Sequence, residues 1–183
     1  MTLVVLVGGA RAGKSALAAD LAHGWEGPVA YVATAEAGDE EMCSRIERHR
    51  SERPAEWTTV EEPLRLGEAL AGLDDGALAV VDCLTLWIAN LLERGGSEEG
   101  ILQEAGAVAT AARTRAAPVV VVTNEVGLGI VPATPSGRAY RDLLGRVNST
   151  FVGQADRAAL VVAGRLLPLE PPAALGDWAW TTS

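Results

Sequence analysis

Residues 8–15 of the chain, GGARAGKS, fit the pattern G-x-x-x-x-G-K-[ST]. Glycines let a backbone turn tightly and point several N–H groups at one anion. Lys14 would place a cation against the terminal phosphates of a nucleotide, and Ser15 would offer a hydroxyl to Mg²⁺. The pattern therefore predicts a P-loop that binds a nucleoside triphosphate with Mg²⁺, formed by Gly8, Gly9, Ala10, Arg11, Ala12, Gly13, Lys14 and Ser15.

The residues on either side of this loop have the pattern that the motif requires. Residues 3–7 are a short apolar run typical of a buried parallel strand, and residues 16–22 continue Ser15 as a helix. The start of that helix also favours an anion, through its dipole and its free N–H groups. A strand, a glycine loop and a helix in this order support a nucleotide site.

Two carboxylates follow other apolar runs. Asp82 ends the run 77–82, where a P-loop enzyme keeps the carboxylate that holds Mg²⁺ through water. The alternative is that Asp82 caps the next helix. Glu125 follows the run 118–123 and could orient or deprotonate a nucleophile near the γ-phosphate. A carboxylate in a turn is an equally good interpretation of Glu125, and the sequence leaves both open.

One of the two histidines lies among arginines, in the group Arg45, Arg48, His49, Arg50 and Arg53. Neighbouring guanidinium groups can hold a triphosphate over the imidazole, and they keep the ring neutral and nucleophilic because they disfavour a second cation. The end of a helix favours the imidazolium instead, so the sequence does not decide between the two forms. The simpler interpretation of His49 is a solvated surface residue. The other histidine, His23, is expected only to complement the end of the first helix.

The composition predicts one globular domain with a substantial core, since 49% of the 183 residues are hydrophobic and 21% are charged. No apolar run approaches the length of a membrane span. Cys43 and Cys83 form no metal-ligand pattern, which favours a cytoplasmic protein with reduced thiols. The net charge of −9 argues against a nucleic-acid partner or an anionic membrane surface. A nucleotide site here must therefore gather its own positive charge.

Apolar strand-like runs alternate with helical patterns along the chain. Strands are predicted over residues 3–7, 28–33, 77–82, 118–123 and 158–163, with a possible short strand at 57–60. Helices are predicted over residues 16–22, 39–50, 64–71, 84–93, 98–115 and 138–154, and a glycine- and proline-rich loop over 127–136. This alternation predicts an α/β fold, a mostly parallel sheet with helices on both faces. Ligands of such sheets bind outside the carboxyl ends of the strands.

We predict a single P-loop NTPase domain over residues 1–167 and a proline-rich C-terminal tail over residues 168–183. The tail carries Trp178 and Trp180. It is expected to be a surface extension or a contact with a neighbouring subunit, and its composition is equally typical of disorder. The guanine-reading motif N-K-x-D of switch GTPases is absent from the chain.

Several further segments carry a resemblance. They are YVAT at 31–34, RIERHR at 45–50, RPAEW at 53–57, VTNEVGLGIVP at 122–132 and RDLLGRVN at 141–148. With the P-loop, they resemble the bifunctional adenosylcobinamide kinase / adenosylcobinamide-phosphate guanylyltransferase family, in order from residue 1 to about residue 164. The block TNEVGLGIVP is far more specific than a P-loop alone.

The resemblance implies two reactions late in cobalamin synthesis. A nucleoside triphosphate, ATP or GTP, phosphorylates the aminopropanol hydroxyl of adenosylcobinamide, and GMP then passes from GTP to that phosphate through a guanylyl-histidine. By position this histidine corresponds to His49, and a nucleotide-contacting glutamate after the tryptophan corresponds to Glu61. The family often has two adjacent histidines here, but the first is Arg48 in this chain.

The resemblance also implies a RecA-like fold, with Mg²⁺ as cofactor, and a homotrimer with sites near the subunit boundaries. With the P-loop, the residues expected to contact nucleotide are Ala33, Thr34, Ala35, Arg48, Arg50, Ser51, Glu52, Arg53, Glu61 and Asp82. Ser15 and Asp82 are expected at the metal, and His49, Lys14 and Glu125 in catalysis. Two alternatives are a P-loop kinase for another small alcohol and a nucleotide-binding regulatory subunit without turnover. The carboxylate of Asp82 speaks against the second.

Overall fold

Strands and helices alternate along the chain in the computed structural model, which describes residues 2–38, 40–51 and 53–171. The strands are β1 (Leu3–Gly8), β2 (Val29–Ala33), β3 (Thr58–Glu61), β4 (Leu78–Asp82), β5 (Val119–Asn124), β6 (Arg157–Val162) and β7 (Arg165–Pro168). The helices are α1 (Lys14–His23), α2 (Glu40–Ser51), α3 (Leu66–Ala71), α4 (Leu84–Glu93), α5 (Glu98–Thr114) and α6 (Pro135–Gln154).

The strands form one sheet in the order β3-β2-β4-β5-β1-β6-β7, and all neighbouring pairs are parallel except β6 and β7. Parallel pairing brings the carboxyl ends of the inner strands to one edge. There Ala33 of β2 lies opposite Asp82 of β4, and Gly8 of β1 lies opposite Asn124 of β5. The predicted α/β class with one mostly parallel sheet is therefore confirmed.

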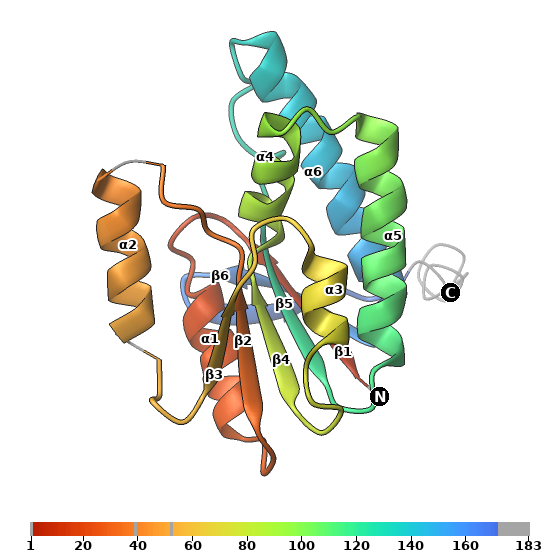
Figure 1. Ribbon diagram of the computed structural model, residues 1–183. Helices are drawn as coiled ribbons and strands as arrows, with labels where there is room; N and C mark the ends of the chain where they lie inside the picture. Colours follow the sequence, from red (N-terminus) through yellow and green to blue (C-terminus); the bar gives the residue numbers. More distant parts are fainter. Residues whose placement is uncertain (1, 39, 52, 172–183) are drawn as a thin grey trace, which may run out of the picture.

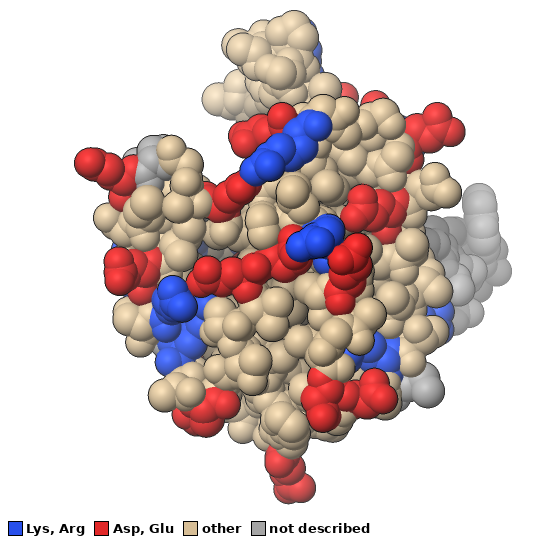
Figure 2. Space-filling model, in the orientation of Figure 1, with Lys and Arg blue, Asp and Glu red and all other residues tan. Residues whose placement is uncertain are grey.

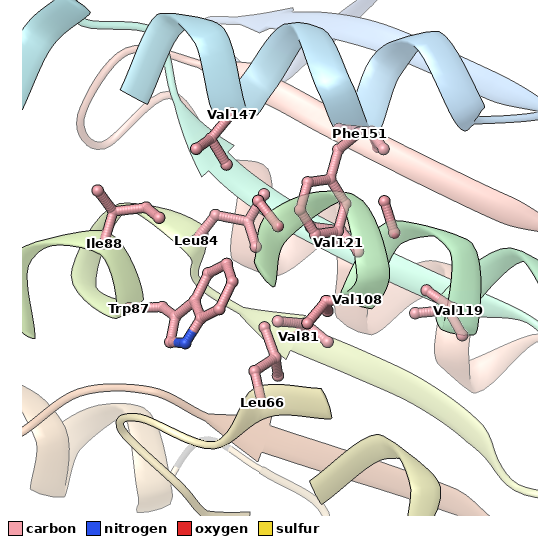
Figure 3. Packing of buried hydrophobic residues seen from close by; sticks show 14 of the residues in the cluster. Leu66, Val81, Leu84, Trp87, Ile88, Val108, Val119, Val121, Val147 and Phe151 are labelled. Carbon is pink, nitrogen blue, oxygen red and sulfur yellow. The ribbon is translucent and has the colours of Figure 1, made fainter. Parts of the chain in front are cut away.

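Helices cover both faces of the sheet (Figure 1). Helices α3, α4, α5 and α6 pack on one face, around a core that includes Trp87 and Phe151 (Figure 3). Helix α1 packs on the other face through Ala18 and Ala22. The central strands are apolar at almost every position because both of their faces are buried. Helix α2 stands at one side of the molecule, away from the other helices (Figure 1).

Most predicted elements end within two residues of the observed bounds, and two larger differences concern strand β7 and the start of helix α6. Strand β7 was not predicted. It follows β6 through a two-residue turn in which Ala163 and Gly164 both have positive φ, and this backbone matches the twist of a hairpin. Helix α6 begins at Pro135, inside the predicted loop, because the Thr134 hydroxyl caps it by accepting from the Gly137 N–H at 3.1 Å.

The chain stays in the sheet slightly beyond residue 167. Strand β7 ends at Pro168, and the Leu169 N–H still donates to the Ala158 carbonyl. Trp178 and Trp180 lie outside the described residues, so the role expected for the tail stays a prediction.

Acidic side chains are widespread on the face shown in Figure 2, and basic ones lie close to them. Ion pairs of the structure include Arg94 with Glu36 and Arg65 with Glu62. This face therefore agrees with the acidic composition, and a bound anion would need cations gathered at a local site.

Candidate nucleotide-binding site

A pocket of about 410 Å³ lies at the carboxyl edge of the sheet and brings together residues from the P-loop, α2 and four strands. It is lined by Ala10, Arg11, Ala12, Gly13, Lys14, Ser15, Ala16, Tyr31, Ala33, Ala35, Ala37, Met42, Ile46, Arg48, His49, Arg53, Glu61, Asp82, Cys83, Leu86, Val122 and Asn124. Segments far apart in sequence thus meet at the edge where ligands of parallel sheets bind.

The P-loop has the backbone that its sequence requires. Gly13, with φ of +100°, precedes α1 and supplies no side-chain cap, so the first N–H groups of the helix can meet an anion. Lys14 is only 6% exposed. Its ammonium donates to the carbonyls of Gly8 at 3.0 Å and Gly9 at 2.7 Å. This arrangement places a buried cation and the first N–H groups of α1 at the same point.

The unpredicted β6–β7 hairpin supports this loop. The Gly164 N–H in its turn donates to the Ala12 carbonyl at 2.8 Å. Gly8, where β1 meets β6, has no room for a side chain, because a Cβ there would lie 2.4 Å from the Val161 carbonyl oxygen. The first glycine of the motif is therefore required by strand packing as well as by the turn.

Asp82 reaches the pocket from the end of β4. One carboxylate oxygen accepts a hydrogen bond of 2.5 Å from the Tyr31 hydroxyl. Burial and the Asp82 charge raise the pKa of this phenol far above its usual range, so it stays a donor. The residue that caps α4 is Cys83, without a side-chain cap bond. The alternative of Asp82 as a helix cap is therefore wrong. Burial and Asp82 also raise the pKa of the Cys83 thiol to about 11.

The arginine-rich segment contributes His49 to the same pocket. His49 lies half-buried in the last turn of α2 and lines the pocket beside Arg48 and Arg53. The Arg53 guanidinium lies over the Tyr31 ring, 3.9 Å from its centroid. Arg50 instead pairs with Glu61 at 3.4 Å.

The predicted contacts divide into those that line the pocket and those that do not. Ala33 and Ala35 line it, whereas Thr34 points away and exchanges hydrogen bonds with the backbone of Cys83. The Ser51 hydroxyl donates to the Arg48 carbonyl and is also outside the lining. Glu52 lies outside the described residues.

Glu125 does not line the pocket, and its neighbour Asn124 does. The Glu125 carboxylate accepts from the Gly127 N–H at 2.5 Å, as a turn residue does. The Asn124 backbone is held on both sides, by the Thr85 hydroxyl at 2.8 Å and the Asn148 amide at 2.9 Å. The sequence analysis missed Asn124. Side chains alternate along a strand, so Asn124 faces the pocket as Val122 does, two residues before it in β5. Glu125 lies beyond the end of the strand.

Ser15 and Asp82 supply oxygen donors to one pocket. No group of three or more His, Cys, Asp or Glu side chains in the described part of the chain could hold a metal ion. Mg²⁺ needs no such cage, because it is usually bound by one or two carboxylates together with substrate phosphates and water. The residues present therefore fit Mg²⁺ that arrives with a nucleotide.

The fold and this loop define a P-loop nucleotide-binding protein of the α/β class. Solved structures with the same fold include the type III secretion ATPase EscN of enteropathogenic E. coli, with a TM-score of 0.58 and 12% identity over 88% of this chain and 43% of that one. A protein of Pyrococcus horikoshii OT3 matches with a TM-score of 0.54 and 9% identity, over 91% of this chain and 85% of that one. Similarity at this level shows the fold alone.

Sequence comparison gives the family. The profile described as cobinamide kinase / cobinamide phosphate guanyltransferase matches residues 4–169, and the chain belongs to this family of bifunctional transferases. It is 40% identical to the bifunctional adenosylcobalamin biosynthesis protein CobP of Pseudomonas aeruginosa, over 91% of this chain and 96% of that protein. It is 38% identical to CobU of Escherichia coli K12, over 88% of this chain and 96% of that protein. Among the described helices, none is long and apolar enough to cross a membrane.

Proposed function

We propose that the chain phosphorylates adenosylcobinamide with a nucleoside triphosphate and transfers GMP from GTP to adenosylcobinamide phosphate. The observation that carries this proposal is the shared pocket, because Lys14 of the P-loop and His49 of α2 both line it. One group suits phosphate binding and the other suits covalent catalysis, so a single cavity holds the residue types that both reactions need.

In the kinase reaction the chain mainly positions charge. Lys14 and the first N–H groups of α1 would bind the phosphates, and Ser15 and Asp82 would hold the hydrated metal. Bound Mg²⁺ neutralises charge on the phosphate oxygens. Asn124, which lines the pocket and whose backbone is held at the end of β5, would orient the attacking hydroxyl. The alternative for this step is that Glu125 orients or deprotonates the hydroxyl.

In the guanylyl reaction the His49 imidazole attacks the α-phosphorus of GTP. A P–N bond forms, the bond between the α- and β-phosphates breaks, and pyrophosphate leaves. A phosphate oxygen of adenosylcobinamide phosphate then attacks the same phosphorus and releases the histidine. Arg48 and Arg53 line the pocket beside His49 and would balance the phosphate charge. Glu61, which lines the pocket and pairs with Arg50 outside the lining, is assigned to nucleotide contact.

The test is the covalent intermediate. Incubation with GTP and Mg²⁺ should add one GMP to the intact mass, in a linkage that is acid-labile and alkali-stable. His49→Ala should lose this adduct and keep most of its nucleotide affinity. His23→Ala is the matched control, because His23 is the other histidine and bonds to the Ala19 carbonyl outside the pocket. An adduct that survives in His49→Ala would refute the assignment.

A P-loop kinase for another small alcohol is the second candidate. The presence of His49 in the pocket disfavours it, because phosphate transfer to an alcohol needs no histidine. The two are separated by one comparison. A kinase of that kind would transfer phosphate to an alcohol other than adenosylcobinamide and would form no guanylyl adduct.

We also propose a homotrimer in the cytoplasm, with sites near subunit boundaries. A loop before α6 supports the assembly, since it exposes three apolar side chains, Leu128 at 83%, Ile130 at 97% and Val131 at 63%. Apolar surface of this kind is typical of an interface. Sedimentation equilibrium tests the assembly, and a monomer mass at every concentration with full guanylyltransferase activity would exclude the trimer.

A further inference from the structure

Tyr31 is the one pocket-lining tyrosine of the described residues, and the proposed function gives it no role. It lies in the buried strand β2, is 4% exposed, and is opposite Val80 of β4. Its side chain runs toward the carboxyl edge, where its hydroxyl donates to Asp82 at 2.5 Å. This bond fixes one carboxylate oxygen of Asp82.

The ring of Tyr31 makes a second contact, with Arg53. The guanidinium carbon lies 3.9 Å from the ring centroid. Stacking of this kind holds the guanidinium plane without using any of its N–H donors. The Arg53 Nε is buried and has no hydrogen-bond partner. The ring therefore fixes the guanidinium of a pocket-lining cation without using its hydrogen-bond donors.

We propose that Tyr31 is a positioning residue that fixes the metal-binding carboxylate with its hydroxyl and the phosphate-binding Arg53 with its ring. It links the two sides of the pocket, since Asp82 ends β4 and Arg53 follows the helix that carries His49. The inference rests on the proposed function, which assigns Asp82 to Mg²⁺ and Arg53 to phosphate.

The two contacts can be removed separately. Tyr31→Phe deletes the hydroxyl and keeps the ring under Arg53. The change leaves the full negative charge on Asp82, which favours the metal, but it also frees the carboxylate to rotate. Loss of such a supporting partner typically weakens metal affinity about 10- to 100-fold, so the loss of orientation outweighs the gain in charge. Tyr31→Leu removes the aromatic ring under Arg53 as well as the hydroxyl. It should therefore lower the affinity for nucleotide that is measured in the absence of metal.

The experiment measures binding rather than turnover. Mn²⁺ affinity is read from the electron paramagnetic resonance signal of free Mn²⁺, with a non-hydrolysable GTP analogue present. Nucleotide affinity is read from a fluorescent GTP analogue in excess chelator. Tyr140→Phe is the matched control, because the Tyr140 hydroxyl donates to the Thr85 carbonyl at 3.0 Å outside the pocket. Thermal unfolding checks that each variant is folded.

Tyr31→Phe should lose about 10- to 100-fold in Mn²⁺ affinity. Its nucleotide affinity, measured in excess chelator, should not change. Tyr140→Phe should keep the wild-type value of both affinities. Unchanged Mn²⁺ affinity in Tyr31→Phe would overturn the hydroxyl contact's role. Unchanged nucleotide affinity in Tyr31→Leu would overturn the ring's role. If Tyr31→Leu does not fold, Arg53→Lys replaces it, since it keeps the charge and loses the stacking plane. A wild-type chain that binds no nucleotide would instead refute the proposed function.

Discussion

Replacing Lys14 by alanine should impair phosphorylation and guanylylation together, because both proposed reactions use the pocket that its ammonium occupies. Lys14 is the only lysine of the chain, and it is almost fully buried beneath the P-loop. In the structure its donors go to the carbonyls of Gly8 and Gly9. A bound triphosphate would present the same ammonium with a full negative charge.

The expected loss follows from this exchange of partners. A charge-assisted contact to phosphate is worth about 1.5–3 kcal/mol, which is roughly 10- to 150-fold in nucleotide affinity. The rate should fall further, on the order of 10²–10³, because charge builds on the phosphate oxygens in the transition state. Folding should change little, within about 1–2 kcal/mol. The Gly8 carbonyl keeps the Glu125 N–H as a donor, and Gly9 is exposed to water.

The assay compares Lys14→Ala with wild type in nucleotide affinity, phosphate transfer and GMP adduct formation. Arg146→Ala is the charge-matched control, since it removes one positive charge at an exposed pair with Glu98, outside the pocket. In the wild type, selective ¹⁵N-lysine labelling gives one backbone amide signal, which should shift when nucleotide binds. Full guanylylation in a Lys14→Ala variant that has lost kinase activity would show that the two reactions use separate nucleotide sites and refute the shared pocket.

Three further outcomes are expected. Asp82→Asn should raise the Mg²⁺ concentration needed for half-maximal activity, because a neutral amide holds the hydrated ion less well; an unchanged Mg²⁺ titration would remove Asp82 from the metal site. Asn124→Ala should slow phosphate transfer to the alcohol more than it weakens nucleotide binding, whereas Glu125→Gln should act mainly on the turn to Gly127. If steady-state kinetics show the larger loss in Glu125→Gln, the role of orienting the hydroxyl belongs to Glu125. Phe151→Ala should lower the free energy of unfolding by about 3–5 kcal/mol in denaturant titrations, since the ring is 1% exposed in the core on the α6 face, and a loss below about 1 kcal/mol would contradict that packing.

The sequence by itself determined the features that depend on short-range geometry. The P-loop could be identified from eight consecutive residues, because its glycines, lysine and serine act on one anion through local backbone. The central strands could be identified because burial on both faces demands apolar residues throughout. Their alternation with helices fixed the fold class, and parallel pairing then predicted the edge where the site lies.

Only the tertiary structure decided which side chains at that edge face the pocket. Asn124 and Glu125 are adjacent in sequence, but Asn124 ends β5 and lines the pocket, whereas Glu125 lies beyond the strand and accepts from the Gly127 N–H. The hairpin that supports the P-loop depends on a turn at Gly164 meeting Ala12, far away in the chain. The contact between Tyr31 and Asp82 likewise depends on which strands are neighbours. Such contacts follow from strand order and register, which long-range packing sets and no local pattern encodes.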